Sequence, residues 1–156
     1  MSFNFIEPAF IPHLTLLPSL IDLDLSYNDL TTLPDDLSNF TFLKKFNLEG
    51  NKFRSDERAS AFWASLATLE RIEILSVSRN QIRGIHTEKL VAGNFSSLIE
   101  LDFSYNIVEN QHNLICARNF VSLKKLYITG NPFALNSQFK GLEMEVYART
   151  GAEVIV

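Results

Sequence analysis

The sequence of 156 residues contains a single cysteine, Cys116. One thiol cannot form a disulfide within the chain, and this favours a reducing compartment over an oxidising one. Basic residues are also in the minority, because 14 Lys or Arg stand against 18 Asp or Glu and give a net charge of −4. Nucleic-acid-binding domains usually carry a basic field or stripe. The composition therefore argues against duplex binding.

Long apolar runs are missing too. A transmembrane helix needs roughly 18 or more consecutive apolar residues, and no stretch of this sequence comes close. The first ten residues lack Lys and Arg and include Glu7 and Pro8, which is not the pattern of a signal peptide. We therefore expect a cytoplasmic protein without membrane insertion. Two glycosylation sequons, at Asn39 and Asn94, keep an extracellular alternative open.

Motifs for catalysis and cofactor binding do not occur. The sequence has no phosphate-binding loop, nucleotide fingerprint or zinc-ligand spacing, and its three histidines lie far apart. Cys116 lies among apolar residues, which predicts a buried and inert thiol. Asp22 and Asp24 would share one strand face, but an open surface offers no dry pocket to shift their pKa values. We expect no enzymatic activity, no cofactor and no metal site.

What the sequence does contain is a repeated frame that ends in asparagine. The asparagines are spaced by 23, 29, 26 and 25 residues and are Asn28, Asn51, Asn80, Asn106 and Asn131. Each lies in the pattern L-x-x-L-x-L-x-x-N-x-L, with Ile, Val or Phe in place of Leu at some positions. The pattern and its period are those of leucine-rich repeats. The chain thus resembles the leucine-rich-repeat family, in its intracellular form without cysteine-rich flanks.

The resemblance implies an α/β solenoid, a segment of a leucine-rich-repeat horseshoe. A short parallel sheet would form its concave face, and mixed helical and 3-10 returns its convex face. The physics of the pattern agrees. Apolar residues at the fourth and sixth frame positions alternate with polar ones, which is the period of a strand with one buried face. One turn cannot bury its own apolar side, so three or more must stack around a shared core.

We expect a single domain over residues 1–156. Its parts are an N-terminal cap or partial repeat at 1–19, five repeats at 20–137 and a C-terminal helix-strand cap at 138–156. In the cap, a helix is predicted from Gly141 to Arg149, with Leu142, Val146 and also Tyr147 facing inward, followed by a strand from Glu153 to Val156. In the second repeat, Trp63 shares one helical face with other apolar residues and is predicted to lie in the core.

The five asparagines are predicted to form a structural ladder. A side-chain amide carries both an acceptor and two donors, so it can satisfy backbone groups that a buried bend would otherwise leave unpaired. We therefore do not propose Asn28, Asn51, Asn80, Asn106 or Asn131 as a binding site.

The concave surface is the predicted binding site, because repeat proteins use this extended surface for partners. The resemblance implies a module that binds another protein, as part of a larger protein. The candidate residues are Ile74, Ser76, Arg79, Tyr105 and Tyr127. Exposed apolar and tyrosine side chains are typical anchors, whereas Asp22 beside Lys45 would cancel in charge. One alternative is a structural part of a stable assembly, such as a ciliary or cytoskeletal complex, and another is an extracellular recognition domain.

Two details of this surface stay open at the level of sequence. Tyr27 and Tyr105 either anchor a partner or merely fill a frame position that tolerates many residues. A further outward row is also predicted, consisting of Ser26, Glu49, Ser78, Ser104 and Thr129.

Overall fold

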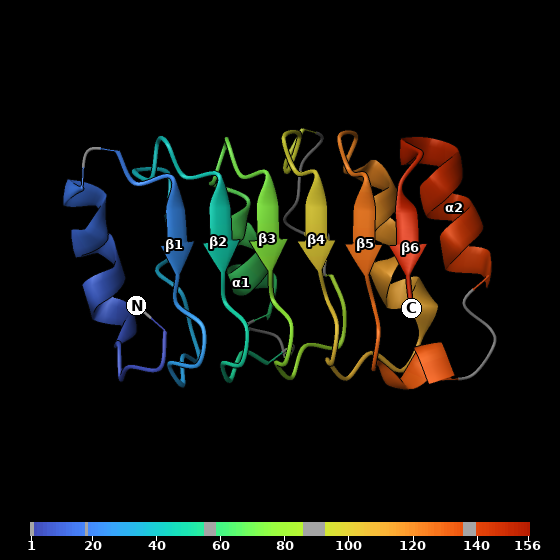
Figure 1. The fold of residues 1–156 in the computed structure, drawn as a ribbon, viewed down its shortest axis with the longest axis horizontal. Coiled ribbons are helices and arrows are strands. Elements are labelled where there is room, and N and C mark those ends of the chain that lie inside the picture. The colour runs from blue at the N-terminus through green and yellow to red at the C-terminus, as the bar shows by residue number, and fades with distance from the viewer. Residues whose placement is uncertain (1, 18, 55–58, 86–92, 136–139) are drawn as a thin grey trace.

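Six short parallel strands form one sheet in the order of the chain (Figure 1). The computed structural model describes residues 2–17, 19–54, 59–85, 93–135 and 140–156. The strands are β1 (Asp22–Asp24), β2 (Lys45–Asn47), β3 (Ile74–Ser76), β4 (Glu100–Asp102), β5 (Lys125–Tyr127) and β6 (Glu153–Ile155). Each strand from β1 to β5 begins at the same place in the repeated frame. This is the α/β solenoid that the sequence predicts.

The register of the sheet explains why the frame is so regular. Each central strand residue is paired with the next one along the solenoid, for example Leu23 with Phe46 and Leu101 with Leu126. From β1 to β5 these central side chains are all buried. Since neighbours in a strand point to opposite faces, the residues on either side of each central one face outward. The apolar layers of successive turns therefore stack into one continuous core.

The returns include η1 (Pro8–Leu16), α1 (Ala59–Leu66), η2 (Gln111–Asn119), η3 (Pro132–Leu135) and α2 (Lys140–Thr150). They lie on the other side of the sheet and at its two ends: Figure 1 shows α1 behind the strands, η1 to the left of β1 and α2 to the right of β6. Trp63 on α1 is buried, packs parallel to Phe103 and donates its indole N–H to the Gly84 carbonyl at 3.0 Å. The predicted core position of Trp63 is confirmed. Cys116 on η2 is also buried, and burial raises the pKa of its thiol to about 12.

The C-terminal part forms the helix and strand that the sequence predicts, α2 and β6. Leu142 and Val146 are buried, as expected, because α2 packs against η2. Tyr147, however, is 66% exposed, so its predicted inward position is wrong. It follows Val146 directly, and one residue along a helix turns the side chain by roughly 100° away from the buried face.

Each asparagine of the frame bridges two turns of the solenoid. The Asn51 side-chain oxygen accepts from the backbone N–H groups of Asn28 and Leu30 in the preceding turn, at 3.1 and 2.9 Å. Its amide nitrogen donates to the carbonyl of Leu25 in that turn and to that of Leu48 in its own, both at 3.0 Å. Asn80, Asn106 and Asn131 repeat this arrangement. The amides thereby satisfy backbone groups that the bends bury.

One further bend precedes β1, and sequence reasoning did not find it. Asn28 accepts, through its side-chain oxygen, from the backbone N–H groups of Asn4 and Ile6, both at 3.2 Å. This matches what Asn51 does for Asn28 and Leu30 one turn later. Phe3 has a left-handed backbone (φ 54°), as Tyr27 has in its own turn. The segment from Phe3 to Ile6 therefore occupies the bend of an earlier turn, and η1 is its return.

Candidate functional site

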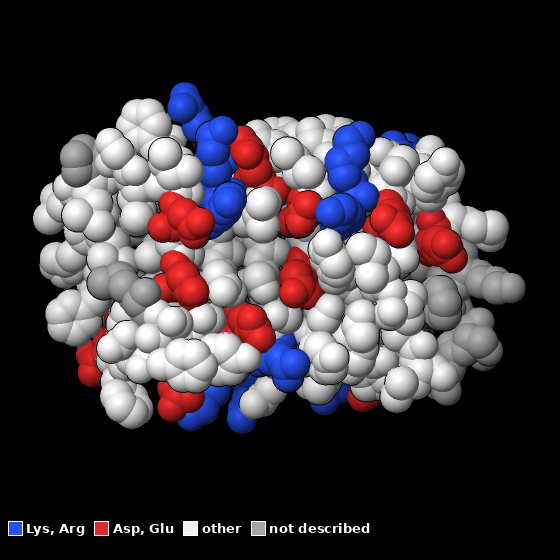
Figure 2. Space-filling view, in the orientation of Figure 1, with Lys and Arg blue, Asp and Glu red and all other residues white. Residues whose placement is uncertain are grey.

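The candidate site is the outward face of the sheet, the expected concave surface, which Figure 2 views from the front. The register places its side chains in two rows, which together are called the sheet face below. The first row is Asp22, Lys45, Ile74, Glu100, Lys125 and Glu153. The second row is Asp24, Asn47, Ser76, Asp102, Tyr127 and Ile155. Both rows run across all six strands.

Charges in the first row compensate only in part. Lys125 Nζ lies 3.2 Å from Glu100 Oε1. The hydrogen bond and the negative charge of Glu100 raise the pKa of Lys125, which therefore stays protonated at neutral pH. Asp22 and Lys45 are also neighbours in register, yet among the described residues no ion pair within 4.0 Å joins them. The expected neutralisation is therefore present on one flank of the row and incomplete on the other.

Ile74 is the apolar member of this row. It lies between Lys45 and Glu100 in register and is half-buried, so it forms part of the floor of the face. Tyr127 lies in the second row between Asp102 and Ile155, and it is half-buried as well. These two predicted residues do belong to the sheet face.

Side chains of the second row hold the bends that follow the strands, which the sequence analysis missed. The Asp24 carboxylate accepts from the backbone N–H and the hydroxyl of Ser26, at 2.8 and 2.6 Å. Asn47 and Asp102 likewise accept from the N–H two residues further on, and Ser76 contacts Ser78 in the same way. Short polar side chains hold local bends through such bonds. The recurrence of Asp, Asn or Ser at one frame position in four repeats was the available signal.

These bends also correct the predicted third outward row. Ser26, Ser78 and Ser104 are buried rather than exposed. The chain turns inward directly after each strand to reach the buried asparagine, so the serines at this position are covered, whereas Glu49 and Thr129 remain half-buried. Ser76, a predicted partner-binding residue, is accordingly engaged with the bend of its own turn.

Asp24 illustrates the chemistry that this face supports. Burial alone would raise the pKa of its carboxyl, but the hydroxyl and backbone N–H of Ser26 lower it more, so the net pKa is below the usual value. The group is therefore a carboxylate at neutral pH and not a proton donor. Within the described ranges, no group of three or more His, Cys, Asp or Glu side chains could hold a metal ion.

A second group of residues follows the strands, at the bend of each turn. Its members all have φ between 53° and 74° and are Tyr27, Gly50, Arg79, Tyr105 and Gly130. The tyrosine ring of one turn lies on the glycine of the next. A Cβ on Gly50 would lie 2.4 Å from the Tyr27 ring, and one on Gly130 would lie 2.5 Å from the Tyr105 ring. The pairing of Tyr with a following Gly is thus steric.

Polar and aromatic contacts join these bends into a row along the carboxyl ends of the strands. This row, called the loop rail below, consists of Tyr27, Glu49, Gly50, Arg79, Tyr105 and Gly130. The Tyr27 hydroxyl donates to Glu49 Oε1 at 2.7 Å, and Arg79 Nε lies 3.1 Å from the same oxygen. The hydrogen bond to Glu49 raises the pKa of Tyr27. The Arg79 guanidinium then lies 4.3 Å from the centre of the Tyr105 ring. Arg79 and Tyr105 are therefore held by each other and by this rail, while Ile74, Ser76 and Tyr127 lie on the strands.

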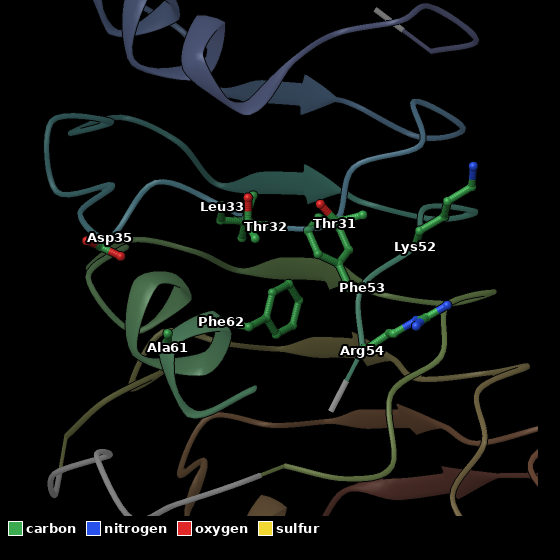
Figure 3. A pocket seen from close by; sticks show the side chains of 9 residues that line it. All are labelled: Thr31, Thr32, Leu33, Asp35, Lys52, Phe53, Arg54, Ala61 and Phe62. Atoms are coloured by element: carbon green, nitrogen blue, oxygen red, sulfur yellow. The ribbon is translucent and has the colours of Figure 1, made fainter. Parts of the chain in front are cut away.

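An open groove of about 680 Å³ lies on the flank of the solenoid, apart from the sheet face (Figure 3). Phe53 and Phe62 form its floor, and both belong to the buried core. Its two cations already have partners: Lys52 lies 3.0 Å from Asp29, and Arg54 donates to Gln81 at 3.0 Å. Among the residues that the structure describes, the groove therefore offers no uncommitted cation for an anionic ligand.

A parallel solenoid with a buried asparagine at each bend defines the class of this protein. The leucine-rich-repeat family model matches residues 19–40, which include β1 and Asn28. The same frame recurs in the four turns that follow, and the chain has the fold of a leucine-rich-repeat solenoid.

Comparisons with solved structures and with curated proteins were also made. One similar solved structure is a leucine-rich-repeat protein of Leptospira interrogans, with 20% sequence identity and a TM-score of 0.44. The match covers 83% of this chain and 42% of that one, so the chain spans less than half of its length. Comparison with curated proteins gave no match. Among the described residues, no helix is long and apolar enough to cross a membrane.

Proposed function

We propose that the chain is a protein-interaction module that binds a partner protein through the sheet face, as part of a larger protein in the cytoplasm. Ile74 and Tyr127 anchor the partner, with Ser76 beside Ile74 at the other end of β3. Tyr105 belongs with them to the centre of the site, and Arg79 forms its rim. Leucine-rich-repeat domains generally mediate protein–protein interactions, and this proposal makes that general role specific for this chain.

One observation carries the proposal. On the same strands, the inward side chains are apolar in every turn, while the first outward row changes from Asp to Lys, Ile, Glu, Lys and Glu. Packing therefore constrains only one face of the sheet. Variation on an exposed, ordered surface is what recognition of one particular partner requires, because specificity resides in the site and not in the fold.

The loop rail supports the same conclusion. Its rings and its guanidinium are already held in place by stacking and by Glu49. A partner that packs on them would not have to immobilise them, and preorganisation of this kind lowers the entropic cost of binding. Tyrosine and arginine are also the side chains that contribute most at interface centres.

The test is capture of partners with matched variants of the chain. Wild type, Ile74→Asp and Tyr127→Ala are used as bait, with Leu135→Asp as the control because Leu135 is an exposed apolar residue of η3. A partner of the sheet face should be captured by wild type and by the control, and lost with the other two variants. Capture that survives Ile74→Asp and Tyr127→Ala but disappears with Lys45→Glu would show an electrostatic site and contradict the proposal.

Two alternatives are separated by further measurements. A permanent structural part of an assembly would stay bound through extensive washing, whereas a regulated module would exchange its partner. An extracellular domain would carry glycans after expression in a secretory host. Of the two sequons, Asn39 is exposed, while the Asn94 amide donates to the Ala67 carbonyl at 3.4 Å. An unglycosylated product would exclude the extracellular alternative.

A further inference from the structure

The two rows of the sheet face differ in how their charges are balanced. In the first row, Lys45 lies beside Asp22 and Lys125 beside Glu100. The second row, from Asp24 to Ile155, contains acids but no Lys or Arg. Together the rows hold five carboxylates and two lysines, a net charge of −3, whereas the whole chain has −4. Figure 2 shows acidic side chains spread along this face.

The two carboxylates of the second row, Asp24 and Asp102, lack a cation to balance them. Among the described residues, no Lys, Arg or His nitrogen lies within 4.0 Å of either one. Both are half-buried, and each accepts the backbone N–H two residues further on, at 2.8 Å for Asp24 and 2.9 Å for Asp102. These bonds fix the carboxylates in place. Two fixed and uncompensated negative charges favour a ligand with cationic groups, because complementary charge steers association and selects the partner.

The separation of the two carboxylates limits the shape of such a ligand. Asp24 on β1 and Asp102 on β4 share one row, so three strand intervals of about 4.8 Å separate them, or about 14 Å in all. In an extended segment, residues i and i+4 are about 13–14 Å apart and point to the same side. A helix presents the same side again after seven or eleven residues, at about 10.5 or 16.5 Å. The spacing therefore favours an extended segment that runs across the strands.

The floor between the two acids is polar in one row and apolar in the other. Residue i+2 of the extended segment would lie halfway between the acids, over Asn47 and Ser76. Ile74 lies two positions before Ser76 on β3 and is half-buried, so it borders this place. An apolar side chain at i+2 can pack on Ile74, and apolar contacts at the centre of an interface contribute most when charged groups surround them.

We propose that the sheet face binds an extended segment of its partner with the pattern basic–x–apolar–x–basic. Two Lys or Arg of this segment pair with Asp24 and Asp102, and the apolar residue between them packs on Ile74. The proposal rests on the proposed function, because it gives the chemistry of the partner at the same face. A second copy of the chain does not fit, since two sheet faces with a net charge of −3 each would repel one another.

The test is an NMR titration of the whole chain with three synthetic nonapeptides. The first, GSRSLSRSG, has arginines four residues apart around a central leucine. The second, GSSRLRSSG, has the same composition with arginines two residues apart, and the third, GSESLSESG, has glutamate in place of arginine. With the first peptide we expect saturable shifts of the backbone amides of Asp24, Ile74 and Asp102. The second should bind at least about fivefold more weakly, and the third should not bind.

Variants of the protein separate pairing with these two acids from a general attraction to the face. Asp24→Asn and Asp102→Asn remove the charge but keep an oxygen for the bend, as Asn47 does at the same position of β2. Each should weaken binding of the first peptide by about threefold, and the double variant by about tenfold. Glu143→Gln, on the exposed side of α2, removes one charge elsewhere and should have no effect. Lys45→Glu should strengthen binding, because it removes a positive charge from the neighbouring row.

Three results would overturn the proposal. These are no saturable shifts at millimolar peptide, equal binding of the first and second peptides, or unchanged binding in the double variant of Asp24 and Asp102. The proposed function is judged separately, by capture of a partner. A partner that is lost with Ile74→Asp but is captured equally by wild type and by the double variant would support the sheet face as a binding site and contradict the basic pattern.

Discussion

The two faces of the sheet are built from the same strands and obey different rules. Inward positions such as Leu23, Leu75 and Leu101 are apolar and almost fully buried in every turn. Outward positions one residue away differ in charge, size and polarity from turn to turn. The inward residues can only be replaced at the cost of the core, while the first outward row is free of that constraint. Core packing therefore restricts every second residue of a strand.

Removal of residues 138–156 should have the largest effect on the stability of the fold. The deletion takes away β6 and α2, and β5 loses the pairing of Leu126 with Val154 and the bond from Ile128 N–H to the Ile155 carbonyl. Leu126 and Ile128, now fully buried, would become a solvent-exposed apolar layer. We expect aggregation or loss of cooperative unfolding, because a solenoid needs a terminal turn that covers its core. A soluble, monomeric truncation with an unchanged melting temperature would contradict this.

Loss of one ladder amide should be the next largest effect. Asn80→Ala strands the backbone groups of Phe53, Leu48 and Val77, and a buried unpaired group costs about 1–3 kcal/mol. Asn39→Ala, at an exposed position, is the matched control and should cost less than about 0.5 kcal/mol. Chemical denaturation of both variants measures the difference. Equal and small losses would show that the asparagines are not structural.

Gly130 tests whether the outward loop rail is structural as well. Its φ of 74° disfavours any side chain, and a Cβ would lie 2.5 Å from the Tyr105 ring. Gly130→Ala should therefore lower the free energy of unfolding by about 1–2 kcal/mol. Adding Tyr105→Ala should recover the steric part and leave only the backbone cost. If the double variant is no more stable than Gly130→Ala, the ring contact is not the cause.

Asp24 should give the smallest effect, and it belongs to the outward residues that hold a bend. Its folded pKa is lowered, so its contribution is present above the unfolded value of 3.8 and is lost as pH falls through the folded value. We expect a contribution of about 0.5 kcal/mol or less, because solvent screens the group. The measurement is the difference in unfolding free energy between wild type and Asp24→Asn at pH 7 and near pH 3. A difference that grows on acidification would have the wrong sign.

Sequence reasoning worked best where one residue position repeats. The frame predicted the strands, the inward layer and the bends, since each is set by a local pattern that occurs five times. Sequence reasoning missed the bend at Asn4, because the residues around it match only the end of the frame and not its apolar strand positions. It misplaced Tyr147 because the edge of a helical face depends on what packs against the helix, which here is η2.

The candidate site was predicted less completely. Ile74 and Tyr127 lie on the sheet face because strand alternation alone places them there. The roles of Arg79 and Tyr105 could not be derived in the same way, because their partners Glu49 and Gly130 lie in neighbouring turns. Ser76 contacts Ser78 within its own turn, a role that the recurring short polar residues could have revealed.

The sequence by itself thus determined the solenoid, its period and the face that is buried, because burial of a repeated apolar pattern has only one regular solution. Only the tertiary structure decided which outward residues hold bends, which are locked in the rail and which stay available to a partner. These properties arise between turns, where residues more than twenty positions apart in the chain come into contact.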